Sequence, residues 1–164
     1  MKRLLVVAVV LAGTAALVTP ALAQAPPVET LFPAPKSAIF LAADTVTASG
    51  NALGAGVRAN YFARGASVVF RAFAGDTKTG RVLTDKDVKF FYVTIPGQPN
   101  LKLAFSKQGT AASAAWLWTA TWTVPADYPL GLVPFRVLIQ TNAKQRGSFQ
   151  QMPVATAQLT ITNA

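Results

Sequence analysis

Three aspartates lie close together in the sequence and are the residues best suited to acid–base or cation chemistry. Asp76, Asp85 and Asp87 are three of the six acidic residues in the 164-residue chain. Clustered carboxylates can bind Ca²⁺, and a pair can act as acid and base in hydrolysis. Basic residues are interspersed with them, Lys86 directly between two, and the spacing is not that of an EF-hand loop. We therefore expect ion pairs and turn caps here, with a carboxylate-dependent hydrolase as the remote alternative.

Two residue types that carry much of the chemistry at neutral pH are missing. The chain has no His and no Cys, so the usual ligands of zinc, copper and haem are absent. No serine has a histidine to act as its base, and none lies in a G-x-S-x-G motif. The sequence therefore predicts no enzymatic activity, no cofactor and no metal site. It also predicts that burial alone, without disulfides, stabilises the fold.

Three tryptophans share one face of a single alternating segment. Threonines and a leucine alternate with Trp116, Trp118 and Trp122. One face of this strand is therefore expected to be buried and the other exposed to solvent. The alternation predicts that the tryptophan face points into the core. The alternative is a carbohydrate-binding module whose three rings form a platform for sugars, which makes these residues the candidate ligand-binding site.

The period of two extends over the rest of the chain. Clean alternation marks residues 101–106, 116–124 and 157–162, and less regular β-rich segments span 68–74, 88–95 and 135–140. Gly- and Pro-rich turns separate these segments, and none shows a capped helix pattern. The sequence predicts an all-β, antiparallel two-sheet sandwich of about seven or eight strands.

Two stretches resemble bacterial immunoglobulin-like domains. They are residues 122–131 (WTVPADYPLG), followed by FRV at 135–137, and residues 75–80 (GDTKTG), followed by 83–88. The resemblance covers roughly residues 65–162 and implies an immunoglobulin-like sandwich. It implies almost nothing about function, because this fold hosts many activities. The cysteine pair of antibody domains is missing, and Tyr128 matches a tyrosine corner only loosely.

The first 23 residues have the pattern of a secretory signal peptide. Lys2 and Arg3 precede a short apolar run, and the segment ends in Ala-Leu-Ala. The alternative of an uncleaved anchor is disfavoured, because the run is shorter than a membrane span and ends at Pro20. We expect a signal peptide (1–23), a Pro-rich tether (24–35), an immunoglobulin-like sandwich (36–164) and no transmembrane span after cleavage. The expected location is the periplasm or the medium.

The charge balance favours acidic partners. The formal charge is +9, and the 13 basic and six acidic residues beyond the leader give +7. Such a field favours acidic polysaccharides or anionic surfaces, and ordinary solubility charge is the alternative that the scattered positions favour. Nucleic acid is not expected for an exported protein without an aromatic–basic motif. The leading hypothesis is a non-catalytic module that binds or bridges a protein partner in the cell envelope. Its expected contact surfaces are an uncovered strand edge and the loops at 96–100 and 142–149.

Overall fold

A computed structural model describes residues 39–109, 114–152 and 158–163, which all belong to one compact unit, Pro35–Ala164. The expected signal peptide (1–23) and tether (24–35) lie outside the described residues. The described part of the chain is all-β and contains no helix, as predicted. Its strands are β1 (Ile39–Thr47), β2 (Tyr61–Ala63), β3 (Ser67–Asp76), β4 (Val88–Thr94), β5 (Leu101–Lys102), β6 (Ala104–Gln108), β7 (Ala115–Thr123), β8 (Gly131–Leu132), β9 (Arg136–Thr141), β10 (Arg146–Gln150) and β11 (Thr160–Thr162).

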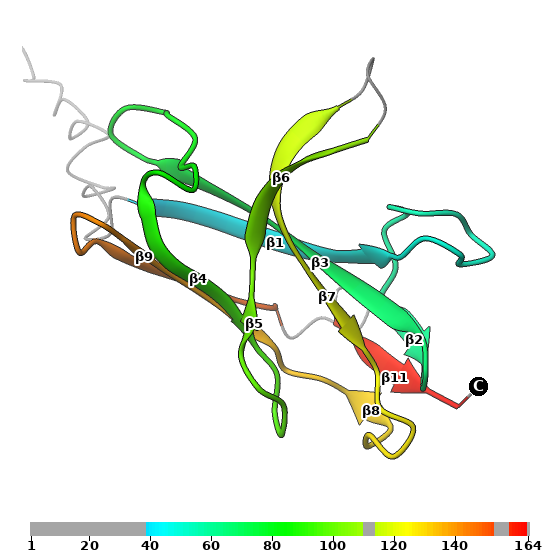
Figure 1. The fold of residues 1–164 in the computed structure, drawn as a ribbon. Helices are drawn as coiled ribbons and strands as arrows, with labels where there is room; N and C mark the ends of the chain where they lie inside the picture. Colours follow the sequence, from blue (N-terminus) through cyan, green and yellow to red (C-terminus); the bar gives the residue numbers. More distant parts are fainter. Residues whose placement is uncertain (1–38, 110–113, 153–157, 164) are drawn as a thin grey trace, which may run out of the picture. The chain divides into compact units, whose positions relative to one another are not determined.

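These strands form three sheets (Figure 1). The first has the order β1-β3-β7-β6, the second β10-β9-β4-β5, and a small third sheet has the order β2-β11-β8. All ladders are antiparallel except that between β2 and β11. The prediction of two sheets therefore missed the small third one.

The predicted count of seven or eight strands is wrong, since the described residues contain eleven. The alternating segment 101–106, for example, is divided at Leu103. On one side β5 pairs with β4 of the second sheet, and on the other β6 pairs with β7 of the first. Leu103 itself is buried, and its N–H donates to the carbonyl oxygen of Phe91 (2.9 Å). The chain thus changes sheets within a pattern that looks continuous.

The inward faces of the two four-stranded sheets supply one hydrophobic core. Phe70 of β3 meets Phe135, which precedes β9, edge to face with ring centroids 5.0 Å apart. Phe91 of β4 meets Trp118 of β7 in the same manner, also at 5.0 Å. Rings of this size bury roughly 150–250 Å² each and dominate core energetics.

Candidate functional site

The tryptophan row is divided between the core and the surface. The rings of Trp118 and Trp122 are only 5% exposed, and Trp118 Nε1–H donates to the Leu83 carbonyl oxygen (2.9 Å). Trp116 is 57% exposed and stacks on Phe105, with ring centroids 5.3 Å apart. The core interpretation thus holds for two of the three residues. Only Trp116 has a ring that a sugar could reach, so the structure contains no three-ring platform.

The three aspartates do not converge on a common point. Asp76 accepts a hydrogen bond from the backbone N–H two residues on (2.8 Å), which caps a turn. The Asp87 carboxylate accepts hydrogen bonds from Nη1 and Nη2 of Arg81 (3.0 and 2.9 Å). It also accepts hydrogen bonds from the backbone N–H and the hydroxyl of Thr84 (2.9 Å each). The Arg81 guanidinium, followed by the Thr84 N–H, lowers the pKa of Asp87 to about 2. Asp85 lies exposed between them in sequence, and the described residues contain no group of three His, Cys, Asp or Glu that could hold a metal ion.

A charged cluster on the outer face of the first sheet went undetected in the sequence. Asp44 of β1 accepts hydrogen bonds from Arg71 of β3 (2.9 and 2.7 Å) and from Arg58 in the following loop (3.3 and 3.2 Å). The hydrogen bond to Asp44 raises the pKa of Arg71. Arg58 and Arg71 lie 14 and 27 positions from Asp44. The β1–β3 ladder brings Arg71 beside Asp44, and an isolated bridge between Val46 and Arg58 brings in Arg58. Two guanidinium groups thus balance the charge of the Asp44 carboxylate, and this carboxylate links the loop after β1 to the first sheet.

Of the two loops expected as contact surfaces, 96–100 is anchored by an aromatic residue. Tyr128 donates its hydroxyl to the Pro96 carbonyl oxygen (3.1 Å), and its ring lies edge-on to Trp122 at 5.0 Å. Burial raises the pKa of Tyr128. The loop 142–149 is a short turn followed by the strand β10, so the expectation of a loop over this range was wrong.

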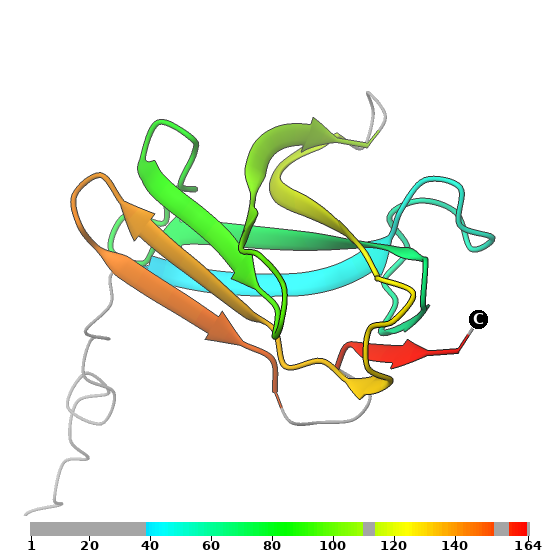
Figure 2. The ribbon, with the colours of Figure 1, turned by 60° about the horizontal axis from the view of Figure 1, so that its bottom comes forward.

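The edge strands β1 and β10 lie beside each other at the junction of the two four-stranded sheets. Each is the last strand of its sheet, and no ladder joins them within the described residues. They are in contact at Gly147, where an added Cβ would lie 3.3 Å from Ile39 Cγ2 and 3.0 Å from Ile139 Cγ2. Figure 2 shows the two strands separating from this end onward. We call the space between them the seam groove.

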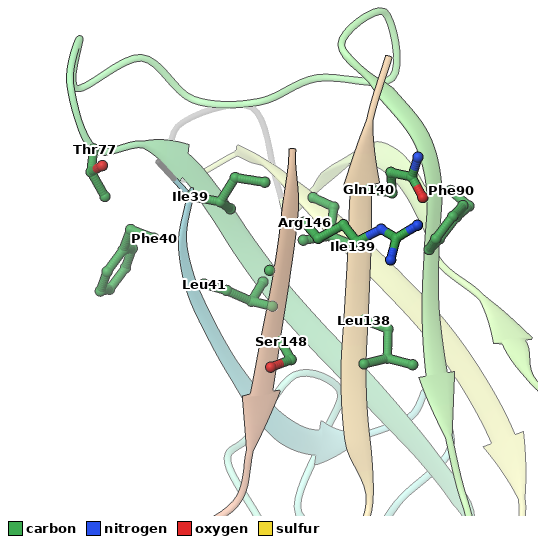
Figure 3. Close-up of a pocket in the computed structure, with 11 residues that line it drawn as sticks. Ile39, Phe40, Leu41, Thr77, Phe90, Leu138, Ile139, Gln140, Arg146 and Ser148 are labelled. Carbon is green, nitrogen blue, oxygen red and sulfur yellow. The ribbon is translucent and has the colours of Figure 1, made fainter. Parts of the chain in front are cut away.

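Two hollows follow the seam groove. The larger has a volume of about 920 Å³ and is drawn in Figure 3, and the smaller, of about 270 Å³, lies further along both strands. The groove is lined along its length by Ile39, Leu41 and Ala43 of β1 and by Gly147, Ser148 and Phe149 of β10. The lining is more apolar than polar, but Arg146 lines the larger hollow, and Asp44 and Arg58 line the smaller one. Phe40, beside the groove on β1, is 54% exposed.

The backbone of β1 presents hydrogen-bonding groups to this groove. Thr45 and Thr47 turn their backbone groups away from β3, since Thr45 accepts from Ala59 N–H (3.2 Å) and Thr47 donates to the residue 57 carbonyl (2.9 Å). Successive residues of a strand point to opposite edges. Leu41 and Ala43 therefore point to the same edge, where no described strand pairs with them.

The backbone of β10 does the same from the other side. Thr141 N–H donates to the Gln145 carbonyl oxygen (2.9 Å). This bond shows which residues of β10 direct their backbone groups toward β9 in the ladder that follows. By the same alternation, Ser148 directs its N–H and C=O away from β9. Two sheet edges with unpaired backbone groups thus border one apolar groove, which is the arrangement that accepts an added strand.

Comparisons of the chain with protein families, with curated proteins and with solved structures find no match. Within the described residues, no helix is long and apolar enough to span a bilayer.

Proposed function

We propose that the protein is an exported, non-catalytic immunoglobulin-like module that binds a protein partner by accepting an extended segment in the seam groove. The observation that carries the proposal is the pair of facing edges, with Leu41 and Ala43 on one side and Ser148 on the other. Unpaired N–H and C=O groups on an edge strand form main-chain hydrogen bonds with an incoming strand.

The direction of the two strands suits such an insertion. Ile39 and Gly147 line the larger hollow, and Ala43 and Phe149, which come later in the two strands, line the smaller one. The strands β1 and β10 therefore run in the same direction along the groove. A partner strand running in the opposite sense would be antiparallel to both. Alternate side chains of that strand would face the apolar lining, which would give sequence selectivity in addition to the main-chain bonds.

Two further features support the class of protein in this proposal. The pattern of residues 1–23 supports export. The shared core of the two four-stranded sheets and the turn after residue 124 support an immunoglobulin-like sandwich. Carbohydrate binding through tryptophan remains an alternative that now rests on Trp116 alone. Hydrolysis is the remote alternative, and two of its candidate acids are engaged elsewhere, Asp76 in a turn cap and Asp87 in an ion pair.

Site-specific photo-crosslinking in the native host tests the proposal. A crosslinking amino acid replaces Phe40 or Ser148, which flank the seam groove, and Thr121 on the outer face of the first sheet is the control. We expect both groove positions to give the same discrete adduct with one protein, whose crosslinked peptide is a short extended segment. Absence of an adduct at both groove positions, or equal adducts at Thr121, contradicts the proposal.

A further inference from the structure

The outer face of the second sheet carries cations and aromatic rings but no carboxylate among its described residues. Its outward side chains include Lys102 of β5, Phe90 and Tyr92 of β4, Arg136 and Leu138 of β9, and Arg146 of β10. Other outward positions, such as Gln140 and Ser148, are neutral and polar, and Lys89 is exposed at the bulge of β4. We call this surface the basic face.

The cationic residues surround an apolar centre formed by Tyr92 and Leu138. The register places Lys102, Tyr92 and Leu138 in one row across the strands, with the rows of Arg136 and Arg146 on either side. From the strand spacing and the rise per residue, the three cationic positions are about 12–16 Å apart. Figure 3 shows Arg146 reaching from β10 across β9 toward Gln140 and Phe90.

The centre is aromatic and only half-buried. Phe90 and Tyr92 stack on each other with ring centroids 5.7 Å apart, and Leu138 next to them is 36% exposed. No described ion pair involves Lys102 or Arg136, in contrast to Arg71 of the first sheet and Arg58 of the loop after β1, which both pair with Asp44. Asp85 shares a hollow with Lys102 but lies in the loop before β4, outside the strands of this face.

We infer that the basic face binds an acidic polysaccharide. Cationic residues whose Cα positions lie more than about 10 Å apart on one face suit carboxylates that recur along a polymer rather than a single anion. The amide and hydroxyl groups between them can pair with sugar hydroxyls, and the aromatic centre can pack against the apolar face of a sugar ring. A lipid surface would call for protruding apolar side chains and a denser cluster of cations. This face shares Phe90, Leu138 and Arg146 with the rim of the larger hollow of the seam groove, whereas Lys102 and Arg136 lie outside the groove. Its ligand is a polysaccharide rather than a protein strand, so the inference goes beyond the proposed function.

Binding of the purified protein to polygalacturonate tests the inference. The double variant Lys102→Gln/Arg136→Gln removes two cations from the basic face, and Lys78→Gln/Lys107→Gln removes two exposed cations elsewhere. We expect the first variant to lower affinity about tenfold and the control less than about twofold, because only the first loses direct contacts. Binding should weaken with added salt, and neutral dextran should not bind.

Three outcomes overturn the inference: no binding of the wild type to polygalacturonate at low salt, equal losses in the two double variants, or tighter binding to phosphatidylglycerol vesicles or duplex DNA than to the polysaccharide. The photo-crosslink at Phe40 distinguishes this result from the proposed function. It should be unchanged in Lys102→Gln/Arg136→Gln, because neither residue lines the seam groove.

Discussion

The molecule contains two groups of aromatic side chains that differ in what covers them. The rings of Phe70, Phe91 and Trp118 lie between the two four-stranded sheets and pack edge to face. Phe40 and Trp116 are more than half exposed. Phe40 borders the seam groove, and Trp116 lies near the end of the β6–β7 hairpin.

The number of aromatic residues alone therefore indicates neither stability nor binding. A covered ring contributes to the free energy of folding, whereas an exposed ring at a sheet edge is available to a partner. Substitutions at covered residues should therefore cost more stability than substitutions at exposed ones.

Removal of a core ring should have the largest effect. Trp118→Ala deletes a covered indole and leaves a cavity, so we expect a loss of about 3–5 kcal/mol from a total of about 5–15 kcal/mol. Thr119→Ala, on the opposite face of β7, should change stability by about 0.5 kcal/mol or less. Denaturant unfolding of both variants measures the contrast, and equal midpoints for Trp118→Ala and the wild type would refute it.

The closed end of the seam groove should be sensitive to added volume. In Gly147→Val, the new Cβ would lie 3.0 Å from Ile139 Cγ2, so neighbouring side chains must shift. Overpacking of this kind costs about 1–3 kcal/mol. The adjacent Ser148→Val points to the other face and should be nearly neutral. Similar thermal midpoints for the two variants would show that β1 and β10 are not in close contact.

The exposed tryptophan should matter less than the covered one. Trp116→Ala removes one stacking contact with Phe105 and little buried area, so we expect a loss of about 1 kcal/mol. The same unfolding assay measures it. A loss as large as that of Trp118→Ala would show that this ring is covered in solution.

The smallest effect should depend on pH. Because the pKa of Asp87 is lowered to about 2, its stabilising contribution is complete above an unfolded-state pKa of about 4. That contribution is lost as the pH falls toward 2. Asp87→Asn should therefore cost less than about 1 kcal/mol at pH 7, since the pair with Arg81 is in contact with water.

The difference between Asp87→Asn and the wild type should vanish near pH 2. Asp85→Asn is the matched control, because Asp85 makes no described hydrogen bond or ion pair. Unfolding midpoints between pH 2 and 7 measure both variants. A constant difference across this range would contradict the role assigned to the Arg81 pair.

Local patterns in the sequence predicted part of the fold correctly. The alternation of β7 predicted the burial of Trp118 and Trp122, because a strand with one covered face imposes a period of two. The pattern did not separate Trp116, since its exposure depends on how far the opposite sheet extends. Likewise, nothing local marks Leu103 as the point where the chain changes sheets.

The seam groove could not be predicted, because it is made by two strands that are about a hundred residues apart in the chain. The sequence of β10 predicts a loop, because Gly147 is its second residue and polar residues flank this glycine. The uncovered edge was expected in general terms, but which strands form it follows only from the strand order.

The proposal that a partner strand adds to β1 in the seam groove can be tested by amide hydrogen exchange along β1. Exchange is measured with and without the segment identified by crosslinking at Phe40. In the free protein, we expect slow exchange at Ala42 and Asp44, which pair with β3, and fast exchange at Leu41 and Ala43, which face the seam groove. Addition of the segment as a peptide should slow Leu41, Ala43 and Ser148 together. Protection of Leu41 and Ala43 in the free protein, or no change on addition, would contradict strand addition at this edge.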